Sequence, residues 1–200
     1  KWAQKALDSG VHGLIAVNRR AGGHAGPKPA EALLDEVGDL GLPVVCAGGI
    51  GTANEFAEAL SMGYAGVQMG TRFIATEECQ ASEPYKQAIV DANEDDIVLT
   101  ERLTGVPVAV INTPYVQRLG LRAGPIARRM LRGRKTKHWM RSLYALKSAW
   151  TLKRTAYDTR GHTEYWQAGR SVAGIDRILP VAEIVNACAD AARTETGGQL

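Results

Sequence analysis

Apolar runs and amphipathic stretches alternate along the first 75 residues. Three short runs are almost continuously apolar and are bounded by glycine or proline, which is typical of buried strands. They cover residues 13–17, 42–47 and 65–69. Residues 29–39 and 53–62 lie between them with the spacing of amphipathic helices, and Thr52 is suited to cap the second helix. Continuous apolar strands are buried on both faces, so the pattern predicts a parallel sheet with helical crossovers.

The chain opens on a helical pattern over residues 2–9 that ends before Gly10, without a strand ahead of it. Three parallel strands do not form a stable sheet by themselves. We therefore expect an α/β fold of the (β/α)8 TIM-barrel class, of which this chain carries three strands together with a helical C-terminal extension. On this hypothesis the sequence is the later part of a longer barrel.

The alternation stops after residue 75. Residues 83–93 have a helical pattern, and two β-rich runs follow at 97–100 and 107–111. Apolar side chains recur at a helical period over residues 136–153, and a last helix is predicted over residues 180–193. The change of pattern divides the chain into a barrel part, a basic helical insertion and a C-terminal segment that returns to the barrel. These three parts are residues 1–115, 116–163 and 164–200.

Composition places the chain among ordinary globular proteins, with 45% hydrophobic and 22% charged residues. No apolar run reaches the roughly 20 residues that span a bilayer, and the first residues do not lead into a signal-peptide core, so a cytoplasmic location is expected. Cys46, Cys79 and Cys188 lie far apart without the spacing of metal ligands. We expect three free thiols and no metal site.

Charge is distributed unevenly along the chain. Residues 118–160 hold thirteen Lys or Arg and one acid, Asp158, which leaves 11 basic and 20 acidic residues elsewhere. The simplest interpretation is a solvated amphipathic helix that packs its apolar face on the barrel. Contact with an anionic surface through residues 118–160 is the alternative, and no nucleic-acid-binding motif accompanies the segment.

Glycine-rich loops follow each of the three predicted strands. Gly48 and Gly49 precede Gly70 by about one strand–helix–strand unit, so both loops are expected at the carboxyl edge of the sheet, where barrels bind phosphate. Glycines there, including Gly22 and Gly23 of the first loop, let backbone N–H groups approach a phosphate closely. His24 is the ionisable side chain in these loops and is a candidate acid–base residue.

Residues 21–26, 44–50 and 68–79 resemble the nitronate monooxygenase family in order and spacing, and residues 166–171 resemble it more weakly. The resemblance implies an FMN-dependent barrel with these strands as its sixth, seventh and eighth. It implies that His24 is the active-site histidine, and that glycines and a threonine of the other two loops bind or shape the FMN phosphate site. These are Gly48, Gly49, Gly51, Gly70 and Thr71.

The function expected from this resemblance is oxidation of alkyl nitronates or nitroalkanes by FMN and O2 to carbonyl compounds and nitrite. An NAD(P)H-dependent quinone reductase or enoyl reductase on the same scaffold is the first alternative. The second alternative is a non-catalytic module that binds a partner through its basic helix. A barrel lacking its first five strands is not expected to close or to hold FMN unaided.

Overall fold

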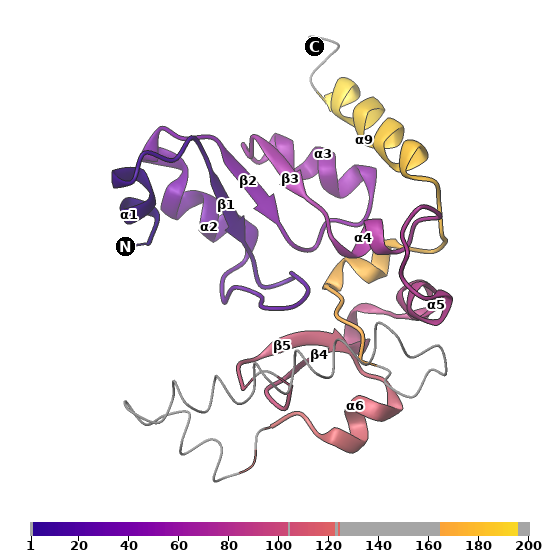
Figure 1. Ribbon diagram of the computed structural model, residues 1–200. Helices are drawn as coiled ribbons and strands as arrows, with labels where there is room; N and C mark the ends of the chain where they lie inside the picture. Colours follow the sequence, from indigo (N-terminus) through magenta and orange to yellow (C-terminus); the bar gives the residue numbers. More distant parts are fainter. Residues whose placement is uncertain (1, 104, 123, 125–164, 196–200) are drawn as a thin grey trace.

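A three-stranded parallel sheet forms the first part of the computed structural model (Figure 1). Its strands, in spatial order, are β1 (Leu14–Val17), β2 (Val44–Ala47) and β3 (Gly66–Gln68). Ala16 faces Cys46 across the first pair, and Cys46 faces Val67 across the second. The parallel arrangement predicted from the apolar runs is therefore confirmed. The structure describes residues 2–103, 105–122, 124 and 165–195.

Helices precede and connect these strands as the pattern predicts. They are α1 (Trp2–Asp8), α2 (Ala30–Val37), the 3-10 turn η1 (Gly38–Leu40) and α3 (Ala53–Ser61). Thr52 caps α3, because its hydroxyl accepts from the Glu55 N–H while the Glu55 carboxylate accepts from the Thr52 N–H. This reciprocal cap fixes where the helix begins and therefore where the glycine loop before it ends.

The chain after β3 forms a series of helices, 3-10 turns and a strand pair, several of which the sequence pattern did not predict. They are α4 (Thr71–Ile74), α5 (Glu83–Asp91), η2 (Glu94–Asp96), β4 (Ile97–Thr100), β5 (Val108–Ile111), α6 (Pro114–Leu119), η3 (Arg170–Gly174) and α9 (Val181–Glu195). The two β-rich runs pair with each other as the antiparallel hairpin β4–β5 and do not extend the parallel sheet.

Residues 165–174, here called the return segment, lie between the hairpin and the parallel sheet (Figure 1). On one side the Ile111 N–H donates to the Trp166 carbonyl at 3.0 Å, and Val110 forms a bridge with Gln167. On the other side the Arg170 N–H donates to the Arg20 carbonyl at 2.9 Å. The return segment thus connects two parts of the fold that are distant in the sequence.

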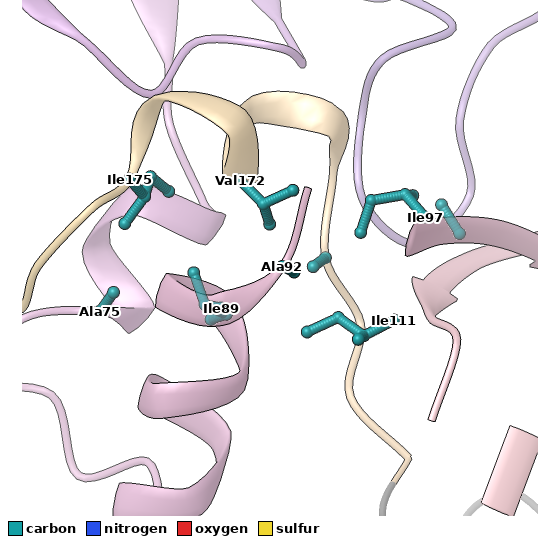
Figure 2. Close-up of a cluster of buried hydrophobic side chains, with 9 residues drawn as sticks. Ala75, Ile89, Ala92, Ile97, Ile111, Val172 and Ile175 are labelled. Atoms are coloured by element: carbon teal, nitrogen blue, oxygen red, sulfur yellow. The ribbon is translucent and has the colours of Figure 1, made fainter. Parts of the chain in front are cut away.

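A buried apolar cluster holds these parts together (Figure 2). Its side chains come from α4 and α5, from the hairpin and from the return segment and the residue after it. Ile89, Val172 and Ile175 are at most 2% exposed. Burial of side chains of this size contributes roughly 1.5–3 kcal/mol each. The position of the return segment is therefore fixed by hydrophobic packing as well as by backbone hydrogen bonds.

Helix α9 packs against α3 and is held at its start by an acidic side chain. The two carboxylate oxygens of Glu78 accept from the Val181 N–H at 2.9 and 3.0 Å, and the Glu77 N–H donates to the Leu179 carbonyl. A carboxylate at a helix N-terminus is favourable because it meets unpaired N–H groups and the positive end of the helix dipole. Glu77 and Glu78, which carry part of the resemblance, therefore dock the last helix.

One expectation about burial is wrong. Ile15 and Val17 of β1 are 60% and 40% exposed, although a strand buried on both faces was predicted. Leu14 and Ala16, on the opposite face, pack in the cluster beneath α2. The helices of the described chain cover one face of the sheet at β1 and leave the other open. The β1 strand is therefore buried on one face only, although its sequence is continuously apolar.

Three further expectations concern the rest of the chain. All three cysteines are free thiols. No helix in the described part has the length and apolar character needed to cross a membrane. The amphipathic helix expected over residues 136–153, and most of the basic segment 118–160, lie outside the described residues. The division of the chain at residues 115 and 163 therefore stays a prediction.

Candidate functional site

A pocket of about 410 Å³ lies at the carboxyl ends of the three parallel strands. Its volume falls within the ~300–1,000 Å³ range of small-molecule sites. All three glycine loops, the start of α4, and side chains from α5 and the return segment form its wall. The lining residues are Val17, Ala21, Gly22, Gly23, His24, Ala47, Gly48, Gly49, Ile50, Gln68, Gly70, Thr71, Ile74, Tyr85, Gln167 and Ser171.

The first loop presents His24 at the rim of this pocket. Backbone pairing holds the loop against the hairpin, because the Ala109 N–H donates to the Gly23 carbonyl at 2.7 Å and the Gly23 N–H donates back at 3.3 Å. His24 itself is exposed, and its imidazole forms no hydrogen bond with a described residue. The loop is therefore fixed by its backbone while the imidazole stays available to a molecule in the pocket.

The second loop depends on a glycine in a conformation that other residues rarely adopt. Gly48 has φ +108°, and a Cβ built on it would lie 2.6 Å from the backbone nitrogen of Ala21. The first and second loops therefore touch at a point where a side chain does not fit.

Asn18 connects the first two loops, although it was not among the residues predicted from the sequence to form the site. Its side chain is 2% exposed, donates from Nδ2 to the Gly48 carbonyl at 2.7 Å and accepts from the Arg20 N–H at 2.8 Å. A polar residue directly after an apolar strand was the signal available in the sequence. The two backbone groups that bond to the Asn18 side chain could not be inferred from the sequence, since one of them is 30 residues away.

The third loop contributes Gly70 and Thr71. A Cβ built on Gly70 would meet no atom within 4 Å, so this glycine borders open space in the pocket. Thr71 is 7% exposed, and its hydroxyl oxygen accepts from the Gly169 N–H of the return segment at 3.0 Å. That bond uses the oxygen as an acceptor and leaves the hydroxyl proton to be donated elsewhere.

Gly51 is the one predicted site residue that does not line the pocket. A Cβ built on it would lie 2.4 Å from the Ser171 carbonyl oxygen, and its N–H donates to the Glu55 carboxylate at 2.7 Å. Gly51 therefore allows the return segment to approach the second loop. The other seven predicted residues, His24 among them, border the same cavity.

The pocket wall carries no Lys, Arg, Asp or Glu side chain within the described chain. Arg20 lies behind the second loop, but its guanidinium is 3.6 Å from both Glu55 and Glu94, and Arg170 pairs with Glu94 at 3.1 Å. These charges compensate one another beside the site. An anionic group in the pocket would be bound mainly by neutral donors.

One side of the pocket is built from aromatic and amide groups. Tyr85 stacks on Trp166 with ring centroids 5.9 Å apart, and its hydroxyl donates to the Gln167 carbonyl. The Gln167 side chain donates from Nε2 to the Tyr165 hydroxyl at 3.0 Å. Burial, more than the neighbouring Tyr165, raises the pKa of Tyr85, so this phenol stays protonated near neutral pH. No motif or spacing in the sequence identified Tyr85 as a lining residue.

Arg72, next to Thr71, has a structural role in spite of its charge. It is 3% exposed and donates from one terminal nitrogen to the Ala75 and Arg177 carbonyls at 2.6 and 2.8 Å. Burial lowers the pKa of this guanidinium. Arg72 does not line the pocket. Its two hydrogen bonds link α4 to the chain that follows the return segment.

Replacing Thr71 with valine is expected to lower the free energy of unfolding by about 1–3 kcal/mol, because the buried Gly169 N–H loses its acceptor. Valine keeps the branched shape, so packing changes little. Denaturant unfolding measures the effect. Ser82→Ala, which removes an exposed hydroxyl without a capping bond, is the matched control. Equal stability of the two variants would show that the bond contributes nothing.

The fold and the pocket define an α/β protein with a ligand-sized site at the strand ends. The model of the nitronate monooxygenase family matches residues 1–190. The chain belongs to this family.

Named relatives agree with the assignment to an oxidoreductase family. The chain is 37% identical over 123 residues to (3aS,4S,5R,7aS)-5-hydroxy-7a-methyl-1-oxo-octahydro-1H-indene-4-carboxyl-CoA dehydrogenase of Mycobacterium tuberculosis, covering 60% of this chain and 35% of the relative. It is 34% identical over 123 residues to a probable nitronate monooxygenase of Staphylococcus saprophyticus, covering 56% and 35%. The chain thus spans about a third of the length of the curated relatives it matches.

A solved structure extends the likeness to nearly the whole chain. FabK from Thermotoga maritima superposes with a TM-score of 0.77 at 26% identity. The superposition covers 98% of this chain and 58% of that one. The match therefore includes the return segment and α9 as well as the parallel sheet.

Proposed function

We propose that the full-length protein is an FMN-dependent oxidoreductase that oxidises alkyl nitronates, or nitroalkanes after deprotonation, to carbonyl compounds and nitrite. The observation that carries this proposal is the single pocket that joins three glycine loops and has His24 at its rim. Membership of the nitronate monooxygenase family supports the choice of substrate class.

The residues of the pocket fit the phosphate of a flavin mononucleotide. The backbone N–H groups of Gly49, Gly70 and Thr71 donate to no described residue, although all three residues line the cavity. A Cβ on Gly70 would occupy space that is now open. Unpaired N–H groups beside an open, uncharged cavity are typical of anion sites built from backbone. We propose that Gly48, Gly49, Gly70 and Thr71 hold the phosphate and that Gly22 and Gly23 border the rest of the cofactor.

His24 would provide the proton chemistry. A neutral imidazole removes a proton from the carbon next to a nitro group, and the fixed backbone of its loop keeps the base beside the substrate. Bound FMN supplies the electron acceptor for the nitronate, and O2 completes the oxidation. The open side of the pocket at His24 leaves room for a small neutral substrate to enter.

The strands β1, β2 and β3 are proposed to be the last three of an eight-stranded barrel. The exposed apolar side chains Ile15 and Val17 support this, because they lie on the face that a closed barrel would bury. A second, largely apolar cavity of about 880 Å³ borders the free edge of β1, between Trp2 and Leu33. A preceding strand and helix would fill that space.

A second candidate keeps the cofactor and changes the reaction to reduction of a quinone or an enoyl thioester by NAD(P)H. The Mycobacterium tuberculosis relative supports a thioester, because it is named as a dehydrogenase of a CoA derivative. That name describes the relative, and we propose a CoA thioester as a substrate to test on this protein.

The visible spectrum of the purified full-length protein tests the cofactor first. About one flavin per chain is expected, and a colourless protein that takes up no added FMN would overturn both candidates. Nitrite release from a preformed alkyl nitronate under air then supports the first candidate. Steady oxidation of NAD(P)H that depends on a quinone or an enoyl thioester, without nitrite release from nitronates, would favour the second.

A further inference from the structure

The return segment places Ser171 in the wall of the pocket beside the second and third glycine loops. Its side chain is 4% exposed, and it lines the same cavity as Gly49, Gly70 and Thr71. Ser171 comes from a part of the chain about 100 residues beyond Thr71. No spacing or motif in the sequence predicts a binding role for Ser171.

Three contacts fix the position of Ser171 between the loops. Two residues before it, the Gly169 N–H donates to the Thr71 hydroxyl at 3.0 Å. One residue before it, the Arg170 N–H donates to the Arg20 carbonyl at 2.9 Å. Its own carbonyl oxygen occupies the space that a side chain on Gly51 would need. Ser171 is therefore held without the use of its hydroxyl group.

The Ser171 hydroxyl forms no hydrogen bond with a described residue. A hydroxyl on a buried residue normally has a partner, because leaving it unpaired costs about 1–3 kcal/mol. Within the described chain, Arg72 Nε is the side-chain polar atom that is sealed in the interior without a partner. The Ser171 oxygen is not sealed in this way, so it opens to the cavity that the residue lines.

The groups around the Ser171 hydroxyl indicate which kind of ligand group it would bind. The described wall carries unpaired backbone N–H groups at Gly49, Gly70 and Thr71, and no carboxylate that would accept from Ser171. Several donors around one cavity match a group with several acceptor oxygens, such as a phosphate monoester. We propose that Ser171 is a phosphate-binding residue that donates its hydroxyl proton to the phosphate of the cofactor. The inference rests on the proposed function.

Flavin titrations of the full-length apoprotein test the inference, with FMN and riboflavin as probes. The two flavins share the ring system and differ in the phosphate, so quenching of flavin fluorescence gives a Kd for each. In Ser171→Ala the Kd for FMN is expected to rise about tenfold or more, because a donor to a charged group is lost. The Kd for riboflavin is expected to stay within about twofold of wild type, since its binding lacks that bond.

Ser82→Ala, which removes an exposed hydroxyl outside the pocket, is the matched control and should change neither Kd. An equal rise of both constants in Ser171→Ala would overturn the inference, because the residue would then support the fold and not the phosphate. Unchanged constants for both flavins would overturn it as well. A wild-type protein that binds neither flavin would instead overturn the proposed function.

Discussion

Turnover of neutral nitroalkanes is expected to fall by about 10²–10⁴-fold when His24 is replaced with asparagine, while turnover of preformed nitronates falls far less. Asparagine is polar and of similar reach, but it has no basic nitrogen. A nitroalkane must lose a proton from carbon before it can be oxidised, whereas a nitronate has already lost it. The ratio of kcat/KM for the two substrates therefore isolates the role of the base.

His12→Asn is the matched control for this measurement. His12 is exposed at the entry to β1 and does not line the pocket, so both kcat/KM values should match wild type. The backbone pairing of Gly23 with Ala109 holds the His24 loop independently of the imidazole, so the substitution leaves these contacts in place. Equal losses on the nitroalkane and the nitronate would remove the base role from His24.

Replacing Gly48 with alanine is expected to lower the free energy of unfolding by about 2–5 kcal/mol. The added Cβ would be in the positive-φ region and 2.6 Å from both the backbone nitrogen and the Cβ of Ala21. Because whole domains are stable by only about 5–15 kcal/mol, the change is large. Denaturant unfolding and thermal unfolding of the full-length protein measure it.

Gly66→Ala is the matched control, since Gly66 lies in β3 with no atom within 4 Å of a built Cβ and no positive φ. Its stability should stay within about 0.5–1 kcal/mol of wild type. If the two alanine variants unfolded alike, the contact between the first and second loops would not contribute to stability. A stable Gly48→Ala protein would also show that this loop can move without cost.

Local patterns predicted the first half of the fold well, because each pattern there has a local physical cause. Thr52 begins α3 by a cap that involves residues only three positions apart. The strand before Gly48 is apolar, and as the central strand of the sheet it is almost wholly buried. The exposure of Ile15 was predicted wrongly, since sequence alone does not say which faces of a strand the rest of the chain covers.

Part of the site was also predictable, because the order of strands and loops along the chain determines where the loops lie. Glycine loops after successive parallel strands meet at one sheet edge, so Gly49, Gly70 and His24 could be placed together from spacing. Their binding and catalytic roles stay predictions. The segment that carries Ser171 and Gln167 is placed by contacts with residues 57 and 98 positions earlier in the chain, and no periodicity records such contacts.

The sequence by itself determined the strand–helix alternation, the edge at which the loops gather and the family to which the chain belongs. The alternation and the gathering of the loops depend on residues close together in the chain or on the repeat of the strand–helix unit. Only the tertiary structure decided that α5 and the return segment complete the wall of the pocket, that Gly51 serves packing, and that Asn18 joins two loops. Each of these depends on backbone groups that meet only after the chain has folded, since hydrogen bonds and close packing act through space.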